Sequence, residues 1–354
     1  MAASGTPYRA VREGAGLADR SGEGRLSVTG ADRHAWLQGL VTNDVGSLAA
    51  GRGCYAAWLT PQGRMITDLR LLELGDRVLV DVPAGLAAAL VERLDRFVIT
   101  EDVQVRDVTG EIARLGVHGP AAAVTLAAAM DRLGPAAASG VSAAALAALA
   151  EHASVAAPLV PREAAASTLI AAASRDVGEP GFDVYLPVAV APGLRAALIS
   201  AGAAEVDHAT WEVLRVEAGR PVFGVDMDEG TIPLEAGIEA RAVSETKGCY
   251  VGQEVLVRVR DRGHGRVARR LVGLMAGDGP TAAAAAVARG DALTAGDREA
   301  GRITSAVLSP ALGTLALGYV HRDFVEPGTR LEAQHGEVAV PLVVVRLPFL
   351  PKQA

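Results

Sequence analysis

The sequence has few cysteines, few aromatic residues and no excess of basic residues, and each shortage excludes a class of protein. Only two of the 354 residues are cysteine, Cys54 and Cys249, and neither belongs to a Cys-x-x-Cys pair. A disulfide framework, a structural zinc site and a self-contained iron–sulfur site are therefore not expected. The 34 Lys and Arg residues are outnumbered by 41 Asp and Glu residues, and only 4% of the chain is aromatic. This composition argues against nucleic acid as a partner.

Other absences concern membranes, metals and nucleotides. Charges, glycines and prolines interrupt the apolar stretches, so no membrane span is expected, and residues 1–10 lack the apolar core of a secretion signal. The seven histidines form no His-x-x-x-His pair, and neither a Walker loop nor a dinucleotide fingerprint is present. We therefore expect a cytoplasmic protein that holds no resident metal.

Half of the residues are hydrophobic, and at about 150 residues per domain the length suggests two or three domains. Segments 56–59 and 65–72 alternate as strands around the turn at 61–63, which predicts a hairpin. Mixed strands and helices follow, an order typical of an α+β fold rather than a doubly wound parallel sheet. The other expected elements are strands 26–30, 77–82, 103–108, 112–117, 182–186 and 255–259 and helices 31–41, 84–98, 120–133, 143–150, 192–201 and 210–218.

The pattern changes near residues 263–265. Beyond this point short strands alternate with glycine-containing turns, which is typical of a small antiparallel barrel or sandwich. The expected strands are 270–274, 302–309, 315–320 and 339–347, with an Ala-rich loop or short helix at 280–288. The sequence thus predicts an α+β region over 1–265 and a β-rich domain over 266–354.

The densest group of chemically active residues is Lys247-Gly248-Cys249-Tyr250-Val251-Gly252-Gln253-Glu254. If its first residues are extended, the side chains of Lys247 and Cys249 share one face. An ammonium group beside a thiol stabilises the thiolate and lowers the thiol pKa from about 8.5. Gly248 and Gly252 permit a close approach of the backbone or a positive φ. This stretch therefore predicts a reactive thiol.

A plainer interpretation exists for each of these residues. A free cysteine is most often a small buried hydrophobic residue, although Cys249 has Gln253 among several polar neighbours. Lys247 and Glu254 are compatible with an ordinary solvated pair that contributes little stability. Cys54 lacks such neighbours, and we interpret it as structural.

Two further segments carry candidate site residues. Arg215 and Glu217 lie near the end of a predicted helix that Gly219 is suited to terminate. A carboxylate at that point could accept hydrogen bonds from the donor-rich edge of a heterocycle, although an exposed glutamate on a helix is the commoner case. Asp68 follows the hairpin turn, where an acid is often simply solvated.

Segment 247–254 resembles the K-G-C-[FY]-x-G-Q-E signature of the YgfZ family of folate-binding proteins, relatives of the glycine-cleavage aminomethyltransferase (T-protein). YgfZ proteins are implicated in the assembly or repair of iron–sulfur clusters. Further segments that resemble the superfamily are 16–20, 37–44, 63–69, 117–120, 215–219, 233–237, 301–305, 309–310, 316–320 and 347–349.

The resemblance implies a cloverleaf of two intertwined α+β lobes around a tetrahydrofolate pocket, the second lobe starting near residue 110, with a C-terminal antiparallel β-barrel. It implies that Glu217 binds the pterin and that Asp68 lies near the reactive folate nitrogens. Lys247 and Cys249 would flank the mouth of the pocket. The remaining residues that it implicates in folate binding are Arg215, Tyr250 and Gln253.

One departure from the T-protein pattern bears on the reaction. The T-protein has two adjacent acids where this chain has Thr67-Asp68, which puts aminomethyl transfer in doubt because an acid is needed to handle protons at the folate nitrogen. The T-protein also lacks the cysteine motif. We therefore expect a monomeric, tetrahydrofolate-binding protein that supports iron–sulfur cluster assembly or repair, with Cys249 as its reactive residue.

Its expected partners are iron–sulfur assembly factors or client proteins. Because one thiol cannot supply the usual four cluster ligands, any contact with a cluster would be transient or shared. Two alternatives stay open: a folate-dependent aminomethyltransferase of the glycine-cleavage type, and a folate-pocket scaffold without chemistry.

Overall fold

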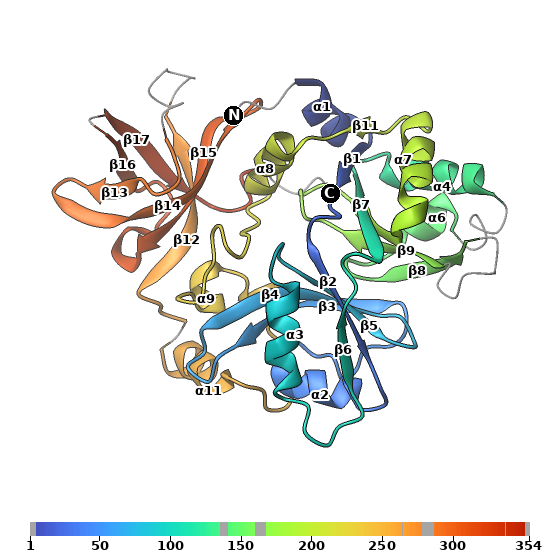
Figure 1. Ribbon diagram of the computed structural model, residues 1–354. Helices are drawn as coiled ribbons and strands as arrows, with labels where there is room; N and C mark the ends of the chain where they lie inside the picture. Colours follow the sequence, from blue (N-terminus) through green and yellow to red (C-terminus); the bar gives the residue numbers. More distant parts are fainter. Residues whose placement is uncertain are drawn as a thin grey trace.

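Three β-sheets organise the chain in the computed structural model, which describes residues 5–134, 141–159, 168–263, 265–277, 287–336 and 338–350. Two sheets belong to α+β lobes, and the third closes into a barrel at the C-terminal end (Figure 1). The α+β fold class and the C-terminal antiparallel barrel are therefore confirmed. No helix in the described part of the chain is long and apolar enough to cross a membrane.

The first lobe contains a five-stranded sheet in the order β3-β4-β5-β2-β6. Its hydrophobic core includes Trp58 and Leu71, which are almost fully buried. The predicted hairpin is present, and its turn contains Gly63 at φ +73°, a conformation that glycine adopts at little cost. The elements are β2 (Gly24–Thr29), α2 (Arg33–Leu40), β3 (Arg52–Leu59), β4 (Met65–Glu73), β5 (Val78–Val82), α3 (Ala87–Asp95) and β6 (Gln104–Asp107).

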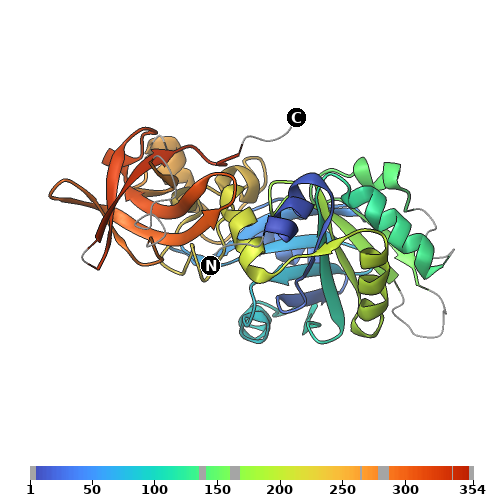
Figure 2. The ribbon, with the colours of Figure 1, turned by 90° about the horizontal axis from the view of Figure 1, so that it is seen from above.

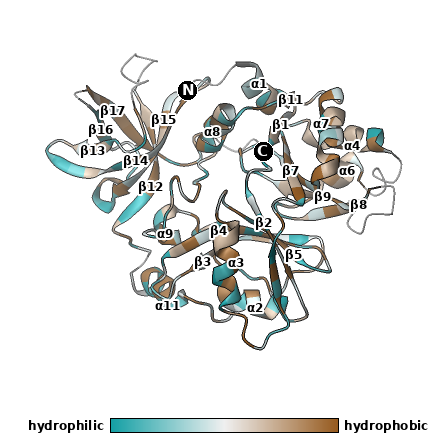
Figure 3. Cartoon of the chain, in the orientation of Figure 1, coloured by the Kyte–Doolittle hydropathy of each residue, from teal (hydrophilic) through white to brown (hydrophobic). Residues whose placement is uncertain are grey.

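The second lobe contains a six-stranded sheet in the order β11-β1-β7-β10-β9-β8. Strand β1 (Gly16–Asp19) pairs here although it precedes the whole first sheet, so the chain passes between the lobes. Helices α4 and α7 contact each other beside this sheet, and Figure 3 shows hydrophobic residues on them. The other elements are α1 (Gly5–Glu13), β7 (Ile112–His118), α4 (Ala122–Leu133), α6 (Ala143–Ala147), β8 (Ser154–Pro158), β9 (Thr168–Ser174), β10 (Gly181–Pro187), the 3₁₀ turn Val188–Val190, α7 (Ala191–Ser200) and β11 (Ala204–Glu205).

Short helices connect the lobes to the barrel: α8 (His208–Glu217), α9 (Pro233–Ala236), α10 (Glu239–Ala242) and α11 (Gln253–Val257). The prediction of a strand over 255–259 is wrong, because α11 continues into a π-helical turn at Arg258–Arg262. The close approach of Gly63 to Val255 shows that α11 packs on the hairpin turn. That packing accounts for the apolar residues that resemble a strand pattern.

The C-terminal barrel closes in the order β12-β15-β14-β13-β16-β17 and lies at one end of the molecule (Figure 2). All four predicted strands are present, and two short strands were not predicted. Most of the Ala-rich segment 280–288 lies outside the described residues. The strands are β12 (Arg269–Ala276), β13 (Ala292–Ala295), β14 (Arg298–Ser309), β15 (Gly313–His321), β16 (Arg330–His335) and β17 (Val338–Val345), with a 3₁₀ turn at Arg322–Phe324.

A buried ion network joins the two lobes. Arg70 on β4 donates to Asp183 on β10 at 2.7 Å and to Asp81 on β5 at 3.0 Å. Arg114 on β7 also donates to Asp183, at 2.9 Å. Burial alone would raise the pKa of Asp183, but the charges of Arg114 and Arg70 outweigh it and hold that pKa well below its usual range. The network therefore fixes the position of one sheet relative to the other next to the candidate site.

Candidate functional site

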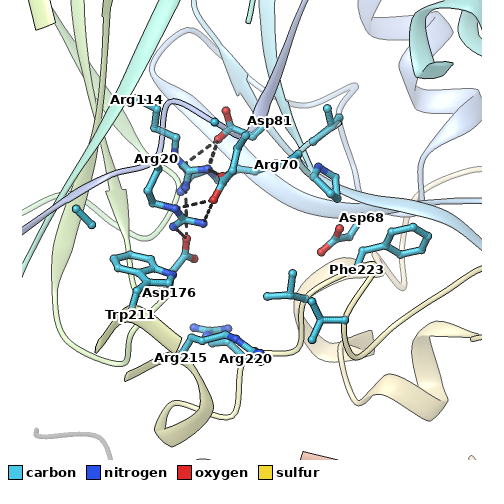
Figure 4. A pocket seen from close by; sticks show the side chains of 18 of the residues that line it. Arg20, Asp68, Arg70, Asp81, Arg114, Asp176, Trp211, Arg215, Arg220 and Phe223 are labelled. Carbon is cyan, nitrogen blue, oxygen red and sulfur yellow. Dashed lines mark hydrogen bonds and ion pairs between the residues drawn. The ribbon is translucent and has the colours of Figure 1, made fainter. Parts of the chain in front are cut away.

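A cavity of about 640 Å³ lies where the two lobes meet helix α8 and the loop that follows it. A volume of this size is typical of small-molecule and cofactor sites. Figure 4 shows Asp68 and Phe223 on one side, the Arg20–Arg114–Asp176 cluster on the other, and Arg215 beside Arg220. Further lining residues are Asp19, Glu23, Tyr55, Leu69, Arg70, Asp81, Val82, His152, Asp207, His208, Trp211, Glu212, Val222, Val225 and Arg241.

Asp68 is the acid in the cavity that is best suited to proton transfer. It lies on β4, and it accepts a 2.7 Å hydrogen bond from the hydroxyl of Tyr55 on the neighbouring strand β3. Burial raises the pKa of Asp68 to about 6, against the lowering effect of the Tyr55 hydrogen bond. With this pKa roughly one tenth of the Asp68 carboxyl groups are protonated at pH 7, so both forms are populated near neutral pH, a condition that favours general acid–base catalysis.

Thr67, the residue that replaces an acid of the T-protein pattern, does not line the cavity. Successive residues of a strand point to opposite faces of the sheet, and Thr67 is fully buried while its hydroxyl donates to the backbone carbonyl of Asp68 at 2.9 Å. The substitution therefore removes no acid from the cavity.

A buried acceptor on Asp81 of β5 and a buried donor on Arg70, two residues beyond Asp68 on β4, lie unpaired on the same sheet face as Asp68. The Oδ2 atom of Asp81 is bound by Arg70 and by Tyr185, whereas its Oδ1 atom is buried without a hydrogen-bond partner among the described residues. The Nη1 atom of Arg70 is equally without a partner there. Buried polar groups are rarely left unpaired, so Asp81 and Arg70 are candidates for ligand contacts, although neighbouring protein atoms cover both unpaired atoms in this structure.

Aromatic side chains provide flat apolar surface within the cavity. Trp211 on α8 is half-buried, and the guanidinium of Arg20 stacks on its ring with Cζ 4.4 Å from the ring centroid. Phe223 lies on the side of Asp68 (Figure 4). Such surfaces favour the binding of a planar heterocycle.

His152 adds a strained residue to the lining. It is the one non-glycine residue with a positive φ, +68°, in the described ranges, and its Nδ1 atom is buried there without a hydrogen-bond partner. Burial and the charge of Arg70 lower its pKa to about 4. His152 therefore presents a neutral imidazole at neutral pH, in a conformation that is common at binding sites.

Glu217 is in a different place from the one that the resemblance implies. It lies at the end of α8, is fully buried and does not line the cavity. Its carboxylate accepts hydrogen bonds from Tyr8 at 3.0 and 3.1 Å and forms shorter contacts with Arg12 and Ser309. These contacts engage both oxygens, so this geometry gives no support to the expectation that Glu217 binds a pterin, and it gives Glu217 a role in joining α1, α8 and β14.

Arg215 does line the cavity, but its guanidinium is fully engaged by the protein. It donates to Asp226 at 2.8 Å, to Ser305 at 2.8 Å and to Glu212 at 2.6 Å. Because every nitrogen of its side chain has a protein acceptor, Arg215 shapes this wall and ties α8 to the barrel strand β14.

The Lys247–Cys249 stretch lies outside the cavity, and its first two side chains diverge. The ammonium of Lys247 donates to the carbonyl oxygens of Gln38, Val41 and Asn43 at 2.6–2.9 Å, near the C-terminal end of α2. Burial lowers its pKa to about 8, opposed by the nearby Asp44 carboxylate and Cys54 thiol. The cysteine that interacts electrostatically with Lys247 is thus Cys54, and the expected pairing of Lys247 with Cys249 finds no support in this geometry.

Cys249 itself is exposed, and Cys54 is partly buried. Burial raises the pKa of the Cys54 thiol to about 12, so that thiol stays protonated and fits the structural role expected for it. The residues around Cys249 form a bent loop rather than a strand. The loop therefore presents Cys249 to solvent, and the Lys247 ammonium is engaged by backbone carbonyls instead.

The other residues of the motif hold this loop in place. Tyr250 is buried, and its backbone N–H donates to the side-chain oxygen of Gln253 at 3.3 Å. Glu254 is exposed and pairs with Arg258 one turn later. Neither Tyr250 nor Gln253 lines the cavity, so their implied folate contacts find no support in this geometry.

Gly252 is the position of the motif where a side chain is excluded. Its φ is +84°, and a Cβ atom there would lie 2.5 Å from the carbonyl oxygen of Thr60. Gly252→Ala should lower the free energy of unfolding by about 1–3 kcal/mol. A Cβ atom at Gly248 would meet no atom within 4 Å, so Gly248→Ala is the control and should change stability by less than about 0.5 kcal/mol. Urea denaturation measures both, and equal stabilities would contradict the packing.

Tyr55 lowers the pKa of Asp68, so the direction of the pKa change on removal of its hydroxyl can be predicted. The Tyr55 hydroxyl stabilises the Asp68 carboxylate, so Tyr55→Phe should raise the pKa of Asp68 further above 6. The shift can be followed by ¹³C NMR of the carboxyl carbon, assigned from the signal lost in Asp68→Asn. Tyr319→Phe removes a hydroxyl that does not line the cavity and should leave this pKa unchanged. A lower pKa in Tyr55→Phe would contradict the assignment.

Several cavity residues were not predicted as site residues, and some left a signal in the sequence. Arg70, Asp81 and Arg114 are charged residues within otherwise apolar strands. A buried strand rarely carries such charges unless they are paired or functional. Arg241, His152 and Tyr55 left no comparable signal, because they lie on a short helix, in a turn and in an ordinary aromatic strand position.

Comparisons with known proteins agree with the fold. The family described as "GCVT N-terminal domain" matches residues 2–247, and "Glycine cleavage T-protein C-terminal barrel domain" matches residues 269–350. Over 97% of the chain, the sequence is 34% identical to an aminomethyltransferase of Rubrobacter xylanophilus, of which it covers 85%. It is 29% identical to an aminomethyltransferase of Saccharopolyspora erythraea, with coverage of 98% and 90% of the two chains.

A crystal structure shares the fold at lower identity. The glycine cleavage system aminomethyltransferase T from Bartonella henselae superposes with a TM-score of 0.83 and 24% identity, over 98% of this chain and 90% of its own. The two family models together match nearly the whole described chain. The N-terminal model covers the two α+β lobes, and the C-terminal model covers the barrel. The protein therefore belongs to the glycine cleavage T-protein family.

Proposed function

We propose that this protein binds tetrahydrofolate in the cavity between its lobes and transfers a one-carbon unit to it, in a reaction of the aminomethyltransferase type. The observation that carries the proposal is Asp68: an acid with a pKa of about 6, held by Tyr55 in a cavity of about 640 Å³. The relatives named aminomethyltransferase support the reaction class.

The polar groups of the cavity fit a reduced pterin. A pterin ring presents N–H donors and a carbonyl acceptor along one edge, and the unpaired Asp81 Oδ1 and Arg70 Nη1 atoms would supply the complementary acceptor and donor once the atoms that cover them move aside. Trp211 offers the flat surface that such a ring requires. In this proposal Asp81 takes the role that the resemblance gave to Glu217.

The proposed chemistry needs one group that moves a proton at a folate nitrogen. As a carboxylate, Asp68 would accept a proton from the attacking nitrogen, and as an acid it would return a proton to the departing amine. The position of Thr67 on the opposite face of β4 leaves this function intact. The doubt that the single acid raised against aminomethyl transfer is therefore reduced.

The direct assay supplies tetrahydrofolate and a lipoyl carrier protein loaded with an aminomethyl group. The transfer forms methylenetetrahydrofolate, releases ammonia and leaves the carrier as its dithiol. Formation of both products above the protein-free blank would support the proposal. Tetrahydrofolate binding without turnover would contradict the proposed transfer and favour the alternative of a folate-binding scaffold without chemistry.

A second function, support of iron–sulfur cluster assembly or repair, is favoured by one observation. Cys249 is exposed on a loop whose backbone is held by Lys247, Tyr250 and Gln253, outside the cavity. A thiol in that place is reachable by a macromolecule, such as an assembly factor or a client protein. We propose it as a role that could accompany folate binding.

Complementation tests this second role. In cells that lack the protein, Cys249→Ala should fail to restore the activity of iron–sulfur enzymes, whereas Cys54→Ala, which removes the partly buried thiol, should restore it if the variant is folded. Full rescue by Cys249→Ala would show that the Cys249 thiol is not required for this role. Because Cys249 does not line the cavity, its replacement should leave tetrahydrofolate affinity unchanged.

A further inference from the structure

The charges around the cavity are balanced at one end and unbalanced at the other. At the balanced end Arg20, Arg70 and Arg114 are each paired with carboxylates, among them Asp176 and Asp183, at 2.6–3.4 Å. Those guanidinium groups are already neutralised by the protein. An anionic ligand therefore has little to gain at that end.

The other end of the cavity holds Arg220 and Arg241, which have fewer carboxylate partners than the arginines at the balanced end. The Cζ atom of Arg241 lies 4.6 Å from the centre of the Tyr55 ring, and within the described ranges no carboxylate lies at ion-pair distance from Arg241. Among the same residues the one ion pair of Arg220 is with Glu151, at 3.2 Å, and the Glu151 side chain is 30% exposed. Two cations thus share one partly solvated carboxylate.

Asp68 makes up the difference only in part. The charge of Arg241 acts to lower the pKa of Asp68, but the Asp68 carboxyl group is hydrogen-bonded to Tyr55 and, among the described residues, forms no ion pair with either arginine. Burial and the charge of Arg241 both lower the pKa of Arg220, which shows that the two guanidinium groups repel each other. Placing an anion between them would relieve that repulsion.

Both arginines are anchored by their backbones. The carbonyl oxygen of Arg241, on α10, accepts a hydrogen bond from the side chain of Asn43 at 3.0 Å. The N–H of Arg220 donates to the carbonyl oxygen of Arg215 at 2.9 Å, just beyond the end of α8. The Tyr55 ring beside Arg241 and the Glu151 ion pair of Arg220 place the two guanidinium groups before a ligand arrives, which reduces the entropy cost of binding.

We propose that Arg220 and Arg241 form a carboxylate-binding subsite next to Asp68, which holds the carboxylate of the ligand whose nitrogen reacts at Asp68. Guanidinium groups bind carboxylates through paired, charge-assisted hydrogen bonds. Two sources carry this chemistry: the glutamate of a folate, and a small amine donor with a carboxylate of its own. The folate source rests on the proposed function, whereas the small-donor source does not.

The experiment compares the affinities of three ligands by anaerobic calorimetry. Tetrahydrofolate carries the glutamate, 6-methyltetrahydropterin lacks it, and N-methylglycine is a small carboxylated amine. Arg241→Met keeps an unbranched apolar side chain near the Tyr55 ring but removes the charge. Arg298→Met removes an exposed barrel arginine and serves as the matched control.

Arg241→Met should weaken one carboxylated ligand by about 10–100-fold, the effect of losing a charge-assisted hydrogen bond, while Arg298→Met changes nothing. A loss confined to tetrahydrofolate identifies the folate glutamate as the occupant. A loss confined to N-methylglycine identifies a small donor. If tetrahydrofolate fails to bind the unmodified protein but N-methylglycine binds through Arg241, the proposed function fails and the subsite stands.

A second variant should act in the opposite direction. Glu151→Gln removes the carboxylate that competes for Arg220, so it should strengthen binding of the same carboxylated ligand several-fold. A merely structural role for the Arg220–Glu151 pair would not strengthen binding. The subsite is overturned if Arg241→Met weakens no carboxylated ligand, if it weakens 6-methyltetrahydropterin equally, or if Glu151→Gln fails to strengthen binding.

Discussion

Asp68→Asn should reduce kcat/KM for one-carbon transfer to tetrahydrofolate by about 10²–10⁴-fold, the usual contribution of a general acid–base group. The amide keeps the shape of the side chain but cannot exchange the proton. Tetrahydrofolate affinity should change much less, because the proposed pterin contacts are made by Asp81 and Arg70 rather than by Asp68. Steady-state kinetics and a binding titration separate the two effects.

The pH dependence gives this variant an independent signature. If the carboxylate is the active form, kcat/KM of the unmodified protein should rise with pH through about 6, the raised pKa of Asp68, and the residual rate of Asp68→Asn should lack that step. Asp95→Asn, an exposed position on α3, should retain full activity and the step. A rate for Asp68→Asn within about threefold of the unmodified protein would contradict the role.

Stability measurements distinguish the loss of the proton-transfer group in Asp68→Asn from unfolding of the variant. The pKa of Asp68 is higher in the folded state than its ordinary value of 3.8, so the folded state binds the proton more tightly. The stability from this group is complete below about pH 4 and is lost as pH rises through about 6. At pH 7.5 Asp68→Asn should therefore unfold no more easily than the unmodified protein.

Glu217→Gln should lower the free energy of unfolding by about 3–5 kcal/mol, the usual cost of breaking a buried ion pair from one side. Glu217 is fully buried, and its removal leaves the Arg12 charge, 15% exposed, with Glu179 alone. Tyr8 and Ser309 would lose the same carboxylate. The expected result is a structural defect, measured by urea denaturation.

A matched control makes this prediction specific. Glu254→Gln breaks an ion pair whose glutamate is 82% exposed, and exposed pairs contribute about 0–1 kcal/mol. The folded fraction of Glu217→Gln should still bind tetrahydrofolate with unchanged affinity. A large loss of affinity with little loss of stability would return Glu217 to the pterin site.

Local sequence patterns predicted much of the fold because the periodicity of apolar residues is a local property. The hairpin 56–72 and the barrel strand 315–320 have clear alternation and turn residues, and both are present. Short strands such as β1 and β13 are too brief to show a pattern. The apolar run after Gly252 was misinterpreted because its partner, the turn at Gly63, is distant in sequence.

The site was harder to predict because it depends on which buried charges find partners. The sequence marks Asp68, Glu217 and Lys247 as equally interesting acids and bases. Only the fold shows that Arg12 engages Glu217, that three backbone carbonyls engage Lys247, and that Asp68 faces open space. Arg241 is the opposite case, because what marks it is that no carboxylate among the described residues lies at ion-pair distance from it.

The most direct test of the account is an anaerobic titration of the protein with tetrahydrofolate, followed by calorimetry and by tryptophan fluorescence. Trp211 lines the cavity, whereas Trp36 and Trp58 are buried in the first lobe. We predict saturable one-to-one binding with a fluorescence change that disappears in Trp211→Phe. No binding heat and no fluorescence change up to about 1 mM ligand, with the protein folded, would contradict the account.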